Sequence, residues 1–195
     1  IVSYEDNINA GTATVVIKGT GNEWGGEVRK TFEIAQAEGT LAVDPVADYT
    51  FTGSARTPEP NFTFTVGTTV YNKADLTVGT DYEYVYTNNV DSTAVSGKKA
   101  TVTVKMLGNY GASNNAAVEF TIAQANVANA DVVVGDVVVG KTPKVAVSMG
   151  GRALVQGTDF TFSADTKTPG TKTATITGKG NYTGTQKVTF TVLNE

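Results

Sequence analysis

Three turns in the sequence place an aromatic residue shortly after a glycine and an asparagine. They are Gly21-Asn22-Glu23-Trp24, Gly108-Asn109-Tyr110 and Gly180-Asn181-Tyr182. A Trp or Tyr ring on an exposed turn can stack on a sugar or contact a protein, because it has an apolar face and a polar edge. The three rings, Trp24, Tyr110 and Tyr182, are therefore the candidate binding residues for a carbohydrate or a protein partner.

The same turns also have a structural interpretation, which their recurrence beside apolar positions favours. Glycine and asparagine form turns, and the ring would close the end of a β-domain with its hydroxyl bonded to the backbone. Trp24 is the strongest candidate for an exception, because its ring is an indole and its turn has one additional residue.

No set of residues in the sequence indicates a catalysed reaction. The chain has no cysteine and no histidine, which excludes disulfides, thiolate zinc sites and Ser-His-Asp triads. The oxygen-bearing residues Glu5-Asp6-Asn7, Asp159 and Asp165 lack the spaced series with a closing Glu that a calcium loop uses, and turn formation explains them. Nothing marks a pair of glycosidase carboxylates. We expect no metal, no cofactor and no enzymatic activity.

Composition narrows the class of partner. The 195 residues carry a net charge of −4 and are 40% hydrophobic, which is typical of a folded globular protein. The chain has no cluster of basic residues, so nucleic acid is not an expected partner. It also lacks the apolar run of roughly 20 residues that membrane insertion requires. Abundant Thr, Val, Gly and Asn without a helical period predict β-structure with tight turns.

The elements that position the turns are alternating strands. In the last copy, Ala174 and Ile176 lie on one face of the strand before the turn. Val188, Phe190 and Val192 lie on one face of the strand after the turn. Threonines occupy the opposite, wet face. The equivalent apolar positions in the two earlier copies are Val15, Ile17, Phe32 and Ile34, and Val102, Val104, Phe120 and Ile122.

A second phrase precedes the strands. Gly79-Thr80-Asp81-Tyr82 matches Gly157-Thr158-Asp159-Phe160, which predicts a turn followed by a strand with alternating aromatic residues. Val2 and Tyr4 continue this series in the first copy. Further strands are expected at residues 49–51, 61–66, 132–134, 137–139 and 144–148.

These recurrences predict three repeats, which we call the first segment (residues 1–37), the second segment (38–125) and the third segment (126–195). The first corresponds to the C-terminal half of a repeat and would expose its apolar residues if it were alone. It would pair with another chain, pack on the second segment, or have its missing strands in a longer natural protein. Self-association through this half repeat is therefore expected. An insertion at Asp91–Lys98 in the second segment is expected in an exposed loop.

About seven short strands in each complete segment, with frequent turns, predict an all-β fold of tandem immunoglobulin-like β-sandwich domains. The ordered phrases Leu-x-x-Gly-Thr-Asp-Tyr, Thr-Ala-Thr, Gly-Lys-Gly-Asn-Tyr-Thr-Gly and Thr-Phe-Thr-Val, clearest in residues 154–192, resemble the bacterial immunoglobulin-like repeats of large surface proteins of Gram-positive and gut bacteria. The second segment departs from the pattern, with Met106-Leu107 in place of Gly-Lys.

The resemblance implies secretion, display at the cell surface and a spacer or adhesive role, and it transfers no catalytic residue. We therefore expect structural spacer repeats of a bacterial cell-surface protein, partnered by neighbouring repeats of a longer chain. The alternative is a module that binds glycan or a host surface protein through the Gly-Asn-aromatic loops or the Asp91–Lys98 insertion.

Overall fold

The computed structural model describes residues 1–22, 25–111 and 114–194. Strands make up 53% of the chain, and the helical elements described are α1 (Thr93–Ser96) and the single 3-10 turns η1 (Lys73–Asp75) and η2 (Val127–Asn129). The prediction of an all-β fold is therefore confirmed. The described residues contain no helix that is long and apolar enough to cross a membrane.

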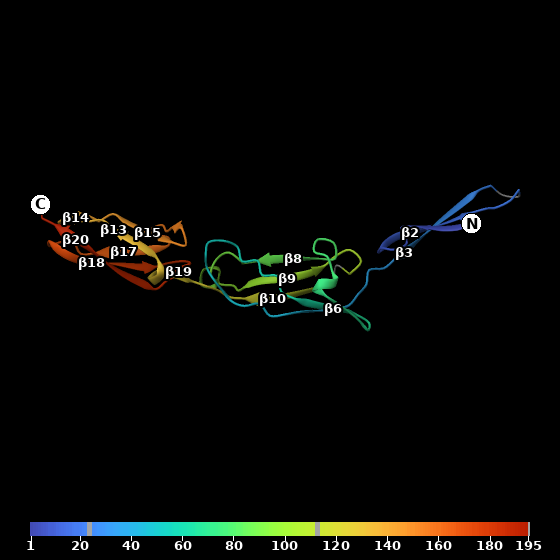
Figure 1. Cartoon of the computed structure of the whole chain (residues 1–195), viewed down its shortest axis with the longest axis horizontal. Coiled ribbons are helices and arrows are strands. Elements are labelled where there is room, and N and C mark those ends of the chain that lie inside the picture. Colours follow the sequence, from blue (N-terminus) through green and yellow to red (C-terminus); the bar gives the residue numbers. More distant parts are fainter. Residues whose placement is uncertain (23–24, 112–113, 195) are drawn as a thin grey trace. The chain divides into compact units, whose positions relative to one another are not determined.

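The chain divides into two compact units. Unit 1 consists of Ile1–Val46, Pro58–Tyr86 and Thr101–Val118, and unit 2 of Ala47–Thr57, Thr87–Ala100 and Glu119–Glu195. The sheet β10-β9-β8, formed by β8 (Tyr82–Thr87), β9 (Ala100–Met106) and β10 (Asn115–Phe120), contributes residues to both units. Figure 1 shows the course of the chain through these elements.

Unit 1 contains two further sheets. The antiparallel sheet β1-β2-β3 is built from β1 (Val2–Glu5), β2 (Gly11–Lys18) and β3 (Glu27–Ile34). The second consists of β4 (Thr40–Val43), β6 (Phe62–Val66) and β7 (Thr69–Asn72). Phe62 and Phe64 of β6 pack with Tyr82 of β8 and with Val104 and Met106 of β9 in one buried cluster. The β4-β6-β7 sheet thus covers the apolar face of β8 and β9.

Unit 2 contains the sheets β13-β15-β16 and β14-β20-β18-β17 and two short pairs, β11-β5 and β12-β19. Its strands are β5 (Tyr49–Thr50), β11 (Ile122–Ala123), β12 (Ala125–Asn126), β13 (Asp131–Val134), β14 (Val137–Val138), β15 (Val145–Met149), β16 (Arg152–Ala153), β17 (Phe160–Ala164), β18 (Gly170–Gly178), β19 (Tyr182–Thr183) and β20 (Thr185–Leu193). Ala174, Phe190 and Val192 form a core cluster on which Val134 and Val137 pack.

The strand code predicted from alternation agrees with the burial. In β18 and β20 the side chains of Ala174, Ile176, Phe190 and Val192 are buried, while the threonines between them are exposed or half-buried. In β9, residues of the same pattern alternate between buried and half-buried positions. The period-2 pattern therefore identifies the inner face of both sheets.

The expectation of an exposed loop at Asp91–Lys98 is wrong in part. Residues 93–96 form α1, which begins after Ser92 and ends at Gly97 in the left-handed conformation. Ser92 is fully buried, and the Thr93 hydroxyl accepts a hydrogen bond from the Ile122 N–H at 3.1 Å. The insertion is thus a helical turn held against β11 by polar contacts, which a strand period does not reveal.

The first segment forms the sheet β1-β2-β3, and the apolar face of this sheet is only partly covered. Phe32 is 41% exposed, whereas the equivalent Phe120 and Phe190 are 2% and 4% exposed. The opposite face carries ion pairs, in which Glu27 accepts from Arg29 at 2.8 Å and lies 3.2 Å from the Lys18 ammonium.

We predict that Phe120→Ala and Phe190→Ala each lower the free energy of unfolding by about 3–5 kcal/mol, because each leaves a cavity in a closed core. The matched substitution Phe32→Ala should cost at most about 1 kcal/mol, since its ring is already in contact with water. Denaturant unfolding followed by circular dichroism measures all three. Equal losses at Phe32 and Phe120 would contradict the assignment of an uncovered face.

Candidate functional site

The Gly-Thr-Asp turns form the base of the candidate site. The Asp159 carboxylate accepts a hydrogen bond from the Val155 N–H at 2.9 Å, and the Asp81 carboxylate accepts one from the Thr77 N–H at 2.8 Å. In each turn the aspartate N–H donates back to the same residue's carbonyl at 2.8 Å. The carboxylate therefore closes the turn locally, which explains why aspartate recurs in this phrase.

The Gly-Asn-Tyr turns lie directly on this base. The Leu107 N–H donates to the Asp81 carbonyl at 2.8 Å, and the Lys179 N–H donates to the Asp159 carbonyl at 2.9 Å. Gly108 has φ +59°, and a Cβ on it would lie 2.8 Å from the Thr80 carbonyl oxygen. A larger residue would therefore be strained in both conformation and contact, so this glycine is required by the turn.

In the third segment this turn binds the tail of the second segment. The Gln124 side-chain amide donates to the Gly180 carbonyl at 2.7 Å, and the Ala125 N–H donates to the Asn181 carbonyl at 3.0 Å. β12 then pairs in parallel with β19, with Ala125 opposite Tyr182. The tail is thus added to the turn as a short strand.

The Asn181 side chain joins the same turn to a loop of the second segment. Its Oδ1 accepts a hydrogen bond from the Ser92 N–H at 2.8 Å, and its Nδ2 donates to the Asp91 carboxylate at 2.9 Å. The amide therefore satisfies a donor and an acceptor that lie about 90 residues earlier in the chain.

The same set of contacts recurs between the first and second segments. The Gln36 side-chain amide donates to the Gly108 carbonyl at 2.7 Å, and the Ala37 N–H donates to the Asn109 carbonyl at 2.8 Å. Asn109 accepts from the Ala10 N–H at 2.8 Å and donates to the Asn9 side chain at 3.0 Å. Two copies of one polar arrangement therefore join successive segments.

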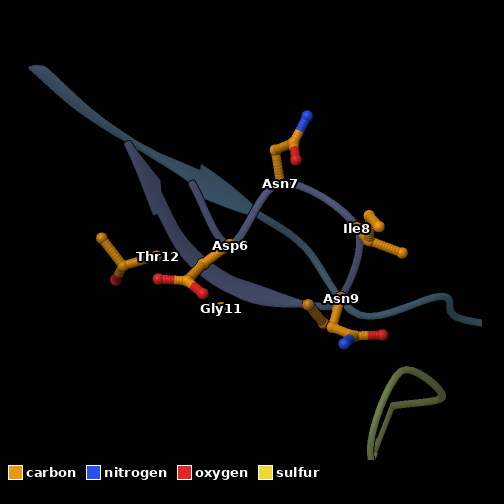
Figure 2. A pocket seen from close by; sticks show the side chains of 7 residues that line it. Asp6, Asn7, Ile8, Asn9, Gly11 and Thr12 are labelled. Carbon is orange, nitrogen blue, oxygen red and sulfur yellow. The ribbon is translucent and has the colours of Figure 1, made fainter. Parts of the chain in front are cut away.

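Figure 2 shows the loop of the first segment that contributes to this arrangement. Residues 6–12 surround a shallow cavity of about 350 Å³, and Asp6 adopts φ +53° at its start. Within the described part of the chain, no group of three or more acidic residues is placed to hold a metal ion. The loop thus offers polar groups to Asn109 without forming a cation cage.

The three candidate rings lie in different surroundings. Tyr182 is only 3% exposed and meets Phe51 edge-on at 5.4 Å between ring centroids. Tyr110 is half-buried between Phe64 and Tyr71, at 5.6 and 5.5 Å. Trp24 lies outside the described residues. A ring as buried as Tyr182 offers no face on which a sugar could stack.

Hydroxyl-to-backbone hydrogen bonds occur at two tyrosines that sequence reasoning did not single out. The Tyr84 hydroxyl donates to the Pro60 carbonyl at 2.8 Å, and the Tyr86 hydroxyl donates to the Pro58 carbonyl at 3.0 Å. These bonds fix the proline-containing connection against β8. Prolines lack an N–H but keep a free carbonyl, which is the group used here.

A cavity of about 290 Å³ adjoins the turn in unit 2. It is lined by Thr50, Phe51, Thr52, Ala125, Asn126, Asn129, Met149, Gly150 and Tyr182. This lining includes no carboxylate and no lysine, so it provides no acid-base pair for a reaction.

Sequence reasoning missed the glutamines. Gln36 and Gln124 stand in the recurring Ile-Ala-Gln-Ala phrase, which ends the first segment and the second segment. The recurrence of one amide at one position was the available signal. The chain matches no protein-family model, no curated protein and no solved structure.

We predict that Asn181→Ala accelerates amide hydrogen exchange at Ser92 and Ala125 by about tenfold or more. The substitution removes the acceptor of the Ser92 N–H, and Ser92 is buried, so the loss weakens the junction. Thr183→Ala, in the same turn but with an exposed side chain, is the matched control and should leave this exchange unchanged. Mass-spectrometric exchange of the full chain measures both. Unchanged exchange in Asn181→Ala would show that the asparagine does not hold the junction.

Burial raises the pKa of Tyr182 above its usual value of 10.0, and the positive charge of Arg152 opposes this shift. Because the raised pKa favours the neutral phenol in the folded state, the associated stability is present below pH 10 and is lost as the pH rises through the folded value. We predict a falling thermal midpoint above pH 10, with a smaller fall in Tyr182→Phe. The same pH dependence in both proteins would contradict this assignment.

Proposed function

We propose that the chain consists of non-catalytic spacer repeats of a bacterial cell-surface protein. The first, second and third segments would be a half repeat and two complete immunoglobulin-like β-sandwich domains, each followed by the tail that the next one binds. The facing sheets and shared core clusters support the sandwich interpretation. The surface location rests on the resemblance of the repeated phrases to bacterial surface repeats.

One observation carries this proposal: both Gly-Asn-Tyr turns are occupied by the preceding segment. Each uses the backbone carbonyls of its Gly and Asn for the tail and the Asn side chain for the preceding loop. Groups that could have bound a ligand are thus engaged in joining neighbours. Directional hydrogen bonds at a fixed register restrict the path of the chain through each junction.

The chemistry of the surface supports a spacer as well. The outer faces of β18 and β20 carry threonine and lysine between the buried positions, which keeps strand propensity without creating an apolar patch. The chain contains no cysteine, so disulfides do not contribute to its stability. Its stability comes from sheets with one buried face and from hydrogen bonds in the turns. Such modules can be added in series without disulfide formation.

The proposal is tested by display. The full chain is placed between a cell-wall anchor and a small binding domain on a Gram-positive cell, and capture of a bead-bound target is measured. A flexible Gly-Ser linker of the same length has an end-to-end distance of roughly 80 Å. We predict that the chain gives more capture than this linker, and that Asn109→Ala with Asn181→Ala lowers capture toward the linker value.

Equal capture by the chain and the linker would contradict the spacer role. The binding alternative is tested on the same protein with a glycan array and a panel of host surface proteins. The spacer role predicts no hit. A hit that is lost in Trp24→Ala, in a variant with an unchanged circular dichroism spectrum, would replace this proposal with the binding role.

A further inference from the structure

Each complete segment contains an early strand that pairs in parallel with a strand near its C-terminal end. In the second segment β5 pairs with β11, with Tyr49 opposite Ile122. In the third segment β14 pairs with β20, with Val137 opposite Val192. The hairpin pairs β17-β18 and β18-β20, in contrast, are antiparallel. The parallel pairs therefore close each complete segment by joining its two ends.

An aspartate directly before each early strand adds a side-chain bond to the parallel pair. The Asp48 carboxylate accepts a hydrogen bond from the Thr121 N–H at 2.6 Å, and the Asp136 carboxylate accepts one from the Thr191 N–H at 2.7 Å. A hydrogen bond to a carboxylate is stronger than one between neutral groups. Each bond therefore fixes the register of its pair at the end where the chain enters the early strand.

The other end of each pair is held by backbone hydrogen bonds. The Phe51 N–H donates to the Ala123 carbonyl at 2.8 Å, and the Val139 N–H donates to the Leu193 carbonyl at 3.1 Å. Both short pairs are thus bonded where they begin and where they end. Sliding of one strand along the other would break these bonds together, because each requires one fixed alignment of donor and acceptor.

The junction between the second and third segments is paired in the same direction. β12 runs parallel to β19, with Ala125 opposite Tyr182, and after Gly184 the chain continues from β19 into β20. The hydrogen bond from the Gln124 amide to the Gly180 carbonyl, at 2.7 Å, lies just before this pair. The chain therefore passes through three parallel pairs in succession: β5-β11, β12-β19 and β14-β20.

The direction of these pairs decides how they respond to tension along the chain. Tension pulls the early strand toward its N-terminal end and the later strand toward its C-terminal end. In a parallel pair these pulls are opposite and lie along the strands, so the strands are loaded in shear and all the bonds between them share the load. Two strands that are pulled apart from one end lose their bonds one after another instead, because the hydrogen bonds lie across the strands.

We propose that the chain is a tension-bearing element, in which the pairs β5-β11, β12-β19 and β14-β20 resist pulling at the chain ends. Asp48 and Asp136 hold the first and the last of these pairs in register under load. The resistance to tension is a property of the folded chain, whereas its use at a cell surface rests on the proposed spacer role.

The test stretches single molecules of the full chain at constant force between handles fused to its two ends, which measures the rate of forced unfolding. The bonds of Asp48 and Asp136 enclose 73 and 55 residues. At the length of an extended chain, the second and third segments therefore release roughly 250 Å and roughly 190 Å, and the step length identifies the segment.

The two aspartates should act on different steps. Asp136→Ala should speed the unfolding of the third segment about fivefold and leave the second unchanged, and Asp48→Ala should do the reverse, because each removes a bond to a carboxylate that is loaded in shear. The matched control is Asp165→Ala, whose carboxylate closes a local turn by accepting from the Lys167 N–H at 3.0 Å. It should change neither step.

A second pulling direction separates bearing of tension from general stabilisation. Because the chain has no cysteine, Lys141→Cys supplies a single attachment point just after β14, to be used with the C-terminal handle. These two points lie at the same end of the parallel pair, so pulling peels β14 from β20. At the same force the third segment should unfold about tenfold faster or more than under end-to-end pulling. Asp136→Ala should change this rate by less than about twofold, because its bond is then loaded last.

Equal unfolding rates in the two pulling directions would overturn the proposal. Equal acceleration by Asp136→Ala in both directions would overturn it as well, since the aspartate would then stabilise the fold without bearing tension. The absence of any effect of Asp48→Ala and Asp136→Ala under end-to-end pulling would remove the role given to the aspartates. These outcomes are separate from the capture assay: a chain that exceeds the flexible linker in capture but fails here is a spacer that does not bear tension.

Discussion

The side-chain amide of one asparagine in each complete segment, Asn109 or Asn181, is the constraint from which the junctions follow. Each amide accepts a backbone N–H and donates to a side-chain oxygen of the preceding loop. An amide has a donor end and an acceptor end in fixed geometry, so it sets both the position and the direction of its partner. An apolar contact at the same place would tolerate sliding, because burial has no preferred direction.

The glycine before each asparagine makes this use of the amide possible. Gly108 and Gly180 adopt positive φ angles and lie against carbonyls of the Gly-Thr-Asp turn. The aspartate of that turn is in turn held by its own backbone. Two local turns, each closed by short-range hydrogen bonds, therefore present the carbonyl groups that receive the tail of the preceding segment. The aromatic ring that follows packs inward and anchors the turn to the core.

The sheets impose the second constraint, since each has one apolar face that must be covered. In the second and third segments the cover comes from earlier strands, which also extend the edge of the sheet in parallel. The first segment has the equivalent face and the equivalent edge, but among the described residues no strand pairs with the edge, and the face is partly exposed. The difference in exposure at equivalent positions shows that the burial of these residues is a property of the cover and not of the strands themselves.

The sequence by itself determined the strands of the repeated hairpins, the inner faces of β9, β18 and β20 and the two recurring turns, because alternation and turn chemistry are encoded within a few residues of one another. It also pointed to Tyr110 and Tyr182 as recurrent, but not to their surroundings. It did not predict β4 or β7. Only the tertiary structure decided that Gln124 meets Gly180, that Asn109 meets the loop at Ala10, and that the insertion after Asp91 contains a helical turn that begins after the buried Ser92. These partners lie 56 and 99 residues apart, and a contact between such distant positions leaves no periodic trace in a single sequence.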